Sequence, residues 1–223
     1  NAGGFGDDED ENIIKCGSFT GVGQTNVGFE PQFLLYKPRS QTANWELADN
    51  MRRLDGVSSS VLKLEPNSAN AEANGSEIKI NATGFYNGTF GVSYPCIYIA
   101  IRMPMKTPTV GTEVFMPVAR TGTGTTAAVT GVGFSPDLFI GNIRDTAGYW
   151  NGVVDRLRGI PKRLVSSQTE AENTQTVITS FDMDGLSLTS DGNGFANENG
   201  KTYIEWLFKR ATGFMDVVAY TGD

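Results

Sequence analysis

The chain has 223 residues, of which 39% are hydrophobic and 19% charged, with 27 glycines and a formal net charge of −7. This length allows one large domain or two small ones, and the negative charge argues against sequence-independent binding to nucleic acid or to an anionic membrane. Because the chain contains no histidine, it lacks the commonest general base and the commonest metal ligand, so we expect neither a metal nor a cofactor.

The N-terminal residues 1–11 include an acidic run, Asp7 to Glu11, and we expect them to form a solvated, flexible leader. The chain does not begin with Met, which suggests a piece of a longer protein. No run approaches the ~20 apolar residues of a membrane-spanning helix, so we expect no membrane insertion.

From residue 12 onwards the chain repeats itself. The matches keep their order, at separations of 100 to 105 residues. They are Gly28–Leu34 with Gly133–Phe139, Trp45 with Trp150, Ala71-Glu72 with Ala171-Glu172, and Thr83–Phe85 with Asp184–Leu186. The run Ile97–Arg102 also matches Tyr203–Lys209, with one residue of slack. We therefore predict a first unit over residues 12–112 and a second over 113–223.

Each unit is composed mainly of strand signals. Phe33–Lys37 and Leu138–Ile143 are short apolar runs after a Gly-Phe-x-Pro turn, and Ser76–Asn81 alternates polar and apolar residues. Hairpin turns are predicted at Asn87-Gly88, Asp184-Gly185 and Asp191-Gly192. The stretches from Trp45 to Leu54 and from Trp150 to Leu164 have helical spacing, but Gly and Pro residues favour strands with an irregular turn. The sequence thus predicts an all-β chain of two tandem homologous β-sandwich units, jelly-roll-like in type.

Two further features leave alternatives open. Cys16 and Cys96 could pair, but two buried, reduced thiols are favoured. A Thr-Gly marker follows three strand-like runs, at Thr20, Thr121 and Thr221. After the third marker the chain either stops at the threshold of a third unit, or the last strand closes the second one.

The pattern resembles a repeated domain of tail-associated and other virion proteins of tailed bacteriophages, especially marine ones, which is often known only as a domain of unknown function. The residues that carry the resemblance are Gly133–Asp137, Trp150, Asp155–Gly159, Asp182–Gly185, Tyr203–Ala211 and Asp216–Gly222. The first unit departs from the pattern, since Ala100 replaces Trp206. The resemblance implies a β-sandwich on a virion surface, and it implies no reaction.

The sequence offers little catalytic chemistry. Without histidine, a Ser-His-Asp triad is excluded. Paired carboxylates can hydrolyse glycosides without histidine, which leaves Asp49, Asp155, Asp182 and Asp184 as the acids to consider, although nothing in their spacing brings two of them together. We therefore expect no catalytic residues and no enzyme.

Sugar binding requires only an aromatic face and a few polar groups. The candidate ligand-binding residues are Asn44, Trp45, Tyr149, Trp150, Asn151, Asp155 and Arg158. The alternative is that each Trp fills the core of its unit, and recurrence in both units favours the core. Trp206, in a long apolar strand, is still more typical of a core residue.

Taken together, we expect a non-enzymatic structural protein of a phage virion, an extracellular particle. A tail fibre or tail-associated segment that recognises host-surface glycan is preferred, with capsid decoration and a polysaccharide-degrading tailspike enzyme as alternatives. Its expected partners are other virion proteins, a host glycan and further copies of itself, a trimer by analogy with fibres.

Overall fold

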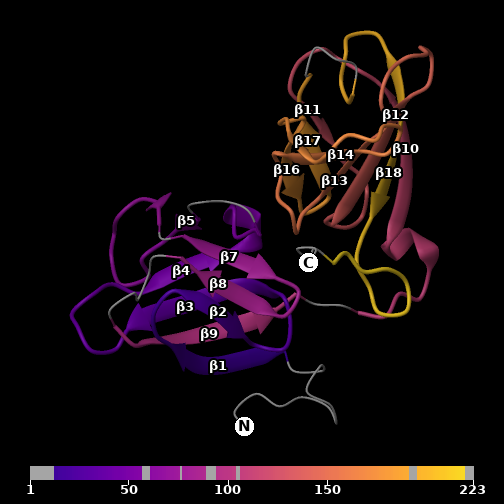
Figure 1. Cartoon of the computed structure of the whole chain (residues 1–223). Coiled ribbons are helices and arrows are strands. Elements are labelled where there is room, and N and C mark those ends of the chain that lie inside the picture. The colour runs from indigo at the N-terminus through magenta and orange to yellow at the C-terminus, as the bar shows by residue number, and fades with distance from the viewer. Residues whose placement is uncertain are drawn as a thin grey trace. The chain divides into compact units, whose positions relative to one another are not determined.

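The computed structural model describes residues 13–56, 61–75, 77–88, 94–103, 106–190 and 195–218, and these form two compact units (Figure 1). The first unit contains the described residues up to Met103, and the second contains Lys106 to Val218. Residues 106–112 pack with the second unit rather than the first, because the 3-10 helix η3 (Gly111–Glu113) leads directly into its first strand. The predicted leader lies outside the described residues.

In the first unit the described residues form nine strands and the 3-10 helix η2 (Asn50–Arg52). The strands are β1 (Ile14–Phe19), β2 (Gly23–Asn26), β3 (Pro31–Pro38), β4 (Glu46–Asp49), β5 (Leu62–Lys63), β6 (Ala73–Asn74), β7 (Ile78–Asn81), β8 (Gly84–Asn87) and β9 (Cys96–Arg102).

In the second unit the described residues also form nine strands. They are β10 (Phe115–Thr121), β11 (Ala127–Val129), β12 (Leu138–Ile143), β13 (Gly152–Asp155), β14 (Lys162–Val165), β15 (Asn173–Thr174), β16 (Ile178–Asp182), β17 (Gly185–Leu188) and β18 (Thr202–Phe208). No helix among the described residues is long and apolar enough to span a bilayer.

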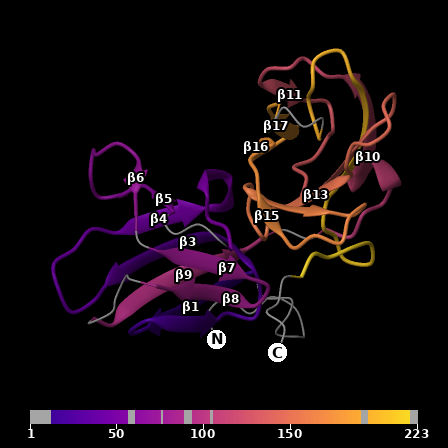
Figure 2. The same cartoon turned by 45° about the horizontal axis from the view of Figure 1, so that its top comes forward.

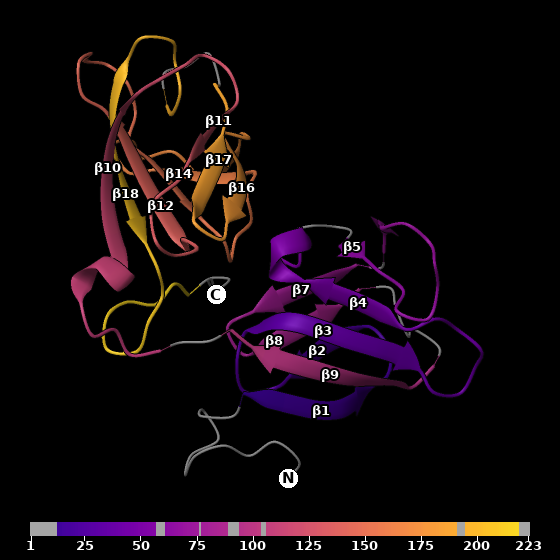
Figure 3. The same ribbon diagram turned by 180° about the vertical axis from the view of Figure 1, so that it is seen from behind.

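The two units have the same strand order, and every strand pair is antiparallel. The larger sheet runs β1-β9-β3-β4 in the first unit and β10-β18-β12-β13-β14-β15 in the second. The smaller sheet runs β2-β8-β7 and β11-β17-β16. In the first unit β5 and β6 form a separate two-stranded sheet. An isolated bridge between Leu47 and Leu64 connects this pair to β4, and the pair lies beside β4 in Figure 2. The predicted all-β class and tandem repeat are therefore confirmed (Figure 3).

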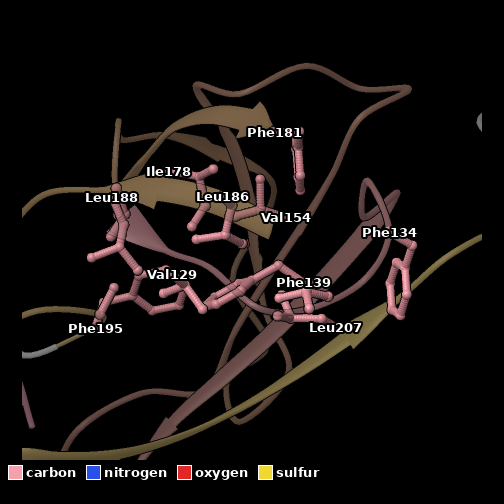
Figure 4. Close-up of a cluster of buried hydrophobic side chains, with 13 residues drawn as sticks. Val129, Phe134, Phe139, Val154, Ile178, Phe181, Leu186, Leu188, Phe195 and Leu207 are labelled. Atoms are coloured by element: carbon pink, nitrogen blue, oxygen red, sulfur yellow. The ribbon is translucent and has the colours of Figure 1, made fainter. Parts of the chain in front are cut away.

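A hydrophobic core lies between the two sheets of the second unit (Figure 4). Leu186 and Leu188 of the smaller sheet face Phe139, Val154 and Leu207 of the larger sheet, and all five side chains are fully buried. Alternate residues of each strand point to opposite faces, so one face of each sheet forms this core.

The repeated Gly in the β7–β8 and β16–β17 hairpins has a steric cause. A Cβ on Gly84 would lie 2.0 Å from the carbonyl oxygen of Thr25, and one on Gly185 would lie 1.9 Å from that of Val129. Thr25 pairs with Phe85 and Val129 with Leu186, so the same close approach occurs in both units. This close approach explains why the glycine is repeated in the matching sequence segments Thr83–Phe85 and Asp184–Leu186.

The strand register shows two equivalent positions at which the cores of the two units contain different kinds of residue. In the second unit Arg120 of β10 forms an ion pair with the fully buried Glu205, with 2.8 Å between Nε and Oε1. At the equivalent positions of the first unit stand Phe19 and Tyr98, whose ring centroids are 6.3 Å apart and which both pack edge-on against Phe85. The second unit thus contains a buried carboxylate paired with a partly buried arginine where the first unit contains an aromatic cluster.

Three local predictions need correction. Asn87-Gly88 is not the β7–β8 turn, because Asn87 ends β8 and its buried amide donates to the carbonyl of Gly21 over 2.7 Å. Both cysteines are free, but only Cys96 is buried; Cys16 is exposed on the opposite face of the sheet. The third strand-like run, which begins at Met215 and precedes the marker at Thr221, forms no strand in its described part, which ends at Val218. The turn predicted at Asp191-Gly192 and the marker at Thr221 lie outside the described residues.

Candidate functional site

The predicted aromatic residues and their asparagine neighbours lie at the same place in both units, just before β4 and β13. Trp45 and Trp150 are half-buried, whereas Asn44 and Tyr149 are exposed. Neither Trp belongs to the buried core, so the interpretation of these rings as core residues is wrong.

In the first unit Trp45 lies within a group of polar side chains. We call this group the Trp45 cluster and define it as Lys37, Asn44, Trp45, Glu65, Asn67 and Asn70. The backbone N–H of Trp45 donates to the side chain of Asn67 over 2.9 Å, and Asn67 in turn donates to Asn44 over 3.0 Å. The ammonium of Lys37 lies 5.6 Å from the centroid of the Trp45 ring.

Glu65 is the centre of the polar part of the Trp45 cluster. Its carboxylate accepts hydrogen bonds from Asn70 over 3.1 Å, from Lys63 over 3.2 Å and from Asn44 over 2.8 Å. The hydrogen bond from Asn70, followed by that from Lys63, lowers the pKa of Glu65 below its ordinary value. The cluster therefore combines a carboxylate, several amides and a half-buried aromatic ring.

The second unit has a simpler version of this arrangement. The backbone N–H of Asn151 donates to the hydroxyl of Ser167 over 3.2 Å. The carbonyl of Asn151 accepts from the backbone N–H of Ser166 over 3.0 Å and from its hydroxyl over 3.4 Å. The loop after β14 thus contacts the start of β13 just as the loop after β5 contacts the start of β4. However, it supplies hydroxyls where the first unit supplies a carboxylate and amides.

Asp155 and Arg158 do not face outward as a binding site requires, because they belong to an internal ion-pair network. Asp155 is only 3% exposed, caps the backbone N–H of Arg158 over 2.8 Å and also binds its guanidinium. Arg158 Nη1 then contacts Glu172 Oε2 at 3.2 Å, and Lys162 contacts the other oxygen of Glu172 at 3.2 Å.

The first unit contains the same network. Arg52 Nε donates to Asp49 Oδ2 over 2.8 Å, and Arg52 Nη1 donates to Glu72 Oε2 over 3.1 Å. Three separate parts of the sequence repeat, the Asp, the Arg three residues later and the Ala-Glu loop, therefore meet at one point in each unit. We assign this network a structural role, since it fastens the loop before β6 or β15 to the end of β4 or β13.

The remaining acids considered for catalysis are also engaged. Asp184 accepts hydrogen bonds from the backbone N–H of Gly133 and Gly131 over 2.6 and 2.9 Å, and these bonds lower its pKa. Asp182 accepts one from the hydroxyl of Ser187 over 2.9 Å. Among the described residues there is no group of three or more His, Cys, Asp or Glu side chains that could hold a metal.

The family comparison matches both units. The family described as Domain of unknown function (DUF7483) matches residues 9–90 and 111–221. The chain belongs to this family. A search of curated proteins found no match, and neither did a search of solved structures. The DUF7483 match falls into two segments, one in each unit, which agrees with the tandem strand order.

The sequence missed four members of the Trp45 cluster in this DUF7483 chain: Lys37, Glu65, Asn67 and Asn70. The last three lie in Glu65–Asn70, a polar segment whose only signal is that of an ordinary turn. Lys37 lies on β3 and reaches the Trp45 ring across the loop that connects β3 to β4.

Proposed function

We propose that this chain is a non-enzymatic structural segment of a phage virion, part of a tail fibre or another tail-associated protein, that recognises glycan on the host surface. The observation that carries the proposal is the Trp45 cluster. It places a half-buried indole beside two asparagine amides and a carboxylate on the surface of the first unit.

The chemistry of the cluster suits a sugar ring. A pyranose has an apolar face, which packs on an aromatic ring, and a rim of hydroxyls, which both donate and accept hydrogen bonds. Asn44 and Asn67 offer amide groups and Glu65 offers an acceptor, and hydrogen bonds link all three to one another or to the Trp45 backbone. Because the side chains already bond to one another, they are held in place before a ligand arrives, which lowers the entropic cost of binding.

The virion location is supported by the resemblance of the repeat to phage virion domains, and a homo-oligomer, a trimer if the protein is a fibre, follows from that location. The alternative within the same class is capsid decoration, where the two units would brace the shell. A tailspike-type enzyme is less well supported, because Asp49, Asp155, Asp182 and Asp184 are all held in hydrogen bonds or ion pairs.

A glycan array tests the recognition step directly. We expect the labelled chain to bind a restricted set of bacterial surface glycans, and Trp45→Ala to reduce that binding at least tenfold. The matched control is Trp206→Ala, which removes an indole from the second unit and should leave glycan binding unchanged. Binding that survives Trp45→Ala, or that both variants lose equally, would contradict the proposed site.

Electron microscopy of antibody-labelled particles separates the structural alternatives. Label on tails supports the receptor-binding proposal, and label on capsids of particles without tails favours decoration. Release of reducing sugar from a bound polysaccharide, lost in Asp155→Asn, would instead support the enzyme.

A further inference from the structure

Lys37 is the positively charged member of the Trp45 cluster. On β3 it alternates with the buried Tyr36 and Pro38, so its side chain lies on the outer face of the larger sheet. Its ammonium is 5.6 Å from the centroid of the Trp45 ring. The quadrupole of an indole attracts a cation at this distance, and this attraction holds the ammonium beside the ring.

Lys37 and the exposed Arg39 form no ion pair within the described part of the chain; the ammonium of Lys37 contacts only the Trp45 ring. Residues 37–45 contain these two cations and no Asp or Glu, in a chain whose formal net charge is −7. The segment that leads to Trp45 is therefore positive on an otherwise acidic protein, and it attracts anions.

The two carboxylates nearest to the cluster have their partners within the protein. The ammonium of Lys63 lies between them, 2.6 Å from Glu46 Oε1 and 3.2 Å from Glu65 Oε1. Glu46 is buried, and its other oxygen accepts a hydrogen bond from the Tyr36 hydroxyl over 2.9 Å. The other oxygen of Glu65 accepts two bonds from the amides of the cluster. Lys37 is thus left to pair with a ligand.

The amides of the cluster also have donors to spare. A side-chain amide has two N–H groups. Asn44, Asn67 and Asn70 each donate one hydrogen bond within the cluster, so each keeps a second N–H for a ligand. These donors suit the hydroxyl and ring oxygens of a sugar, and the ammonium of Lys37 suits a negatively charged substituent.

Strand register aligns this part of the two units. Leu34 pairs with Ala100 in the first unit, and Phe139 pairs with Leu207 in the second. Leu34 and Phe139 occupy the same position of the sequence repeat, so Ala100 corresponds to Leu207. The sequence match that sets Ala100 against Trp206 is therefore wrong.

The same register shows that the second unit lacks the cation. Three residues further along the strand, Lys37 of β3 corresponds to Asn142 of β12. Both units have the Trp, since Trp150 matches Trp45, but only in the first unit does an ammonium lie at this position. The fold therefore does not require Lys37, which favours a role for this residue in binding.

We infer that the Trp45 cluster binds an acidic sugar, with the carboxylate or phosphate group of the sugar on the Lys37 ammonium and the sugar ring on the indole. This inference rests on the proposed function and restricts it from glycans in general to anionic glycans. Because a charge-assisted hydrogen bond is stronger than a neutral one, Lys37 determines the specificity, and Trp45 supplies the contact area that any sugar uses.

A panel of paired glycan probes tests the inference on the whole chain. The anionic probes are uronic-acid oligosaccharides and phosphorylated oligosaccharides. Each has a neutral partner, which is the carboxyl-reduced or the dephosphorylated form of the same oligosaccharide. Wild-type protein should bind anionic probes of at least one kind about tenfold more tightly than their partners. The kind that shows the preference identifies the charged group.

Three variants test whether the preference comes from Lys37. Lys37→Asn copies the second unit and should weaken binding of anionic probes about tenfold, to the level of their neutral partners. Lys37→Arg keeps the charge and should keep the preference. Lys106→Asn is the control, since it removes a charge from a side chain of the second unit that is 76% exposed, and it should leave binding unchanged.

The inference is overturned if wild-type protein binds the neutral partners as tightly as the anionic probes, if the preference survives Lys37→Asn, or if Lys37→Arg or Lys106→Asn loses it as completely. In each of these cases glycan binding itself remains, and the proposed function stands. If no probe binds, or if Trp45→Ala binds as tightly as wild type, the proposed function fails and the inference fails with it.

Discussion

At the scale of single residues, the two units are stabilised by the same ion-pair network with different degrees of burial. The side chain of Asp155 is 4% exposed and that of Asp49 is 25% exposed, while Arg158 and Arg52 are 15% and 22% exposed. An ion pair in a drier environment is less screened, and loss of one partner leaves the other charge without compensation. The second unit should therefore depend more strongly on its copy of the network.

We expect Arg158→Ala to lower the free energy of unfolding of the second unit by about 1–3 kcal/mol, since it leaves the buried Asp155 unpaired. Arg52→Ala should have a smaller effect on the first unit. Urea unfolding curves measure both, with Arg144→Ala as the control because Arg144 is exposed. A loss in Arg158→Ala no larger than in the control would show that the network contributes nothing.

The two cysteines should differ sharply in reactivity. Burial, followed by the charge of Glu46, raises the pKa of the Cys96 thiol to about 11, whereas Cys16 is exposed. Only the thiolate reacts with iodoacetamide. At pH 8 in the native state we therefore expect mass spectrometry to find one alkylated cysteine, Cys16, and two after unfolding. Rapid native labelling of Cys96 would contradict its placement.

The raised pKa of the Cys96 thiol also affects the stability of the fold at alkaline pH. Because the folded-state pKa of Cys96 exceeds its ordinary value of 9.0, its contribution to stability is complete below about pH 9 and is lost as the pH rises through about 11. Cys96→Ala should weaken this pH dependence.

At the scale of the elements, the two units fill the inner face of their first and last strands with different residue types. β1 and β9 contribute Phe19 and Tyr98 where β10 and β18 contribute Arg120 and Glu205. Burial raises the pKa of Glu205 although Arg120 opposes the shift, so the carboxylate is costly to ionise. The aromatic cluster of the first unit avoids that cost.

A reciprocal swap tests this interpretation. Arg120→Phe alone should destabilise the second unit by about 3–5 kcal/mol, because it leaves the buried Glu205 unpaired. Glu205→Tyr alone should cost less, because Arg120 is partly exposed and keeps its hydrogen bonds to Asn197 and Ala196. The double variant copies the first unit and should be more stable than either single variant. Urea unfolding provides the free energies for this double-mutant cycle. A double variant with the summed loss of the singles would refute the equivalence of the two positions.

The sequence predicted what depends on local signals. β12 spans the predicted Leu138–Ile143, and β3 contains the predicted run but begins two residues earlier, at Pro31, because the Pro and the turn act within a few residues. The faces of β18 could not be predicted, since both are apolar. From polarity alone, Glu205 is predicted to face solvent and Trp206 to face the core. In the structure Glu205 faces the core, where it pairs with Arg120, and Trp206 therefore lies on the opposite face of β18.

The candidate site was predictable only in part, because contacts between residues far apart in the chain leave no local signal. Asn44 and Trp45 were found because a Trp with polar neighbours is a recognisable pattern. Glu65 and Asn67 join them across about twenty residues of chain, through hydrogen bonds that no local pattern records. The match of Ala71-Glu72 with Ala171-Glu172 was visible in the sequence, but the contact of Glu72 with Arg52 depends on the fold.

At the scale of the whole molecule, each of the two units encloses its own core. Each unit has its own pair of sheets with the same strand order, and the closing strand β9 or β18 pairs with the first strand of its own unit. Long-range pairing of this kind completes a unit without help from the other one.

The most direct test compares amide ¹H–¹⁵N NMR spectra of the whole chain with those of residues 12–104 and 105–223 expressed separately. We expect each shorter chain to give a dispersed β-type spectrum that overlays the whole-chain spectrum, apart from residues near 104–105. Collapsed, poorly dispersed spectra from either shorter chain would contradict the claim that the two units fold around separate cores.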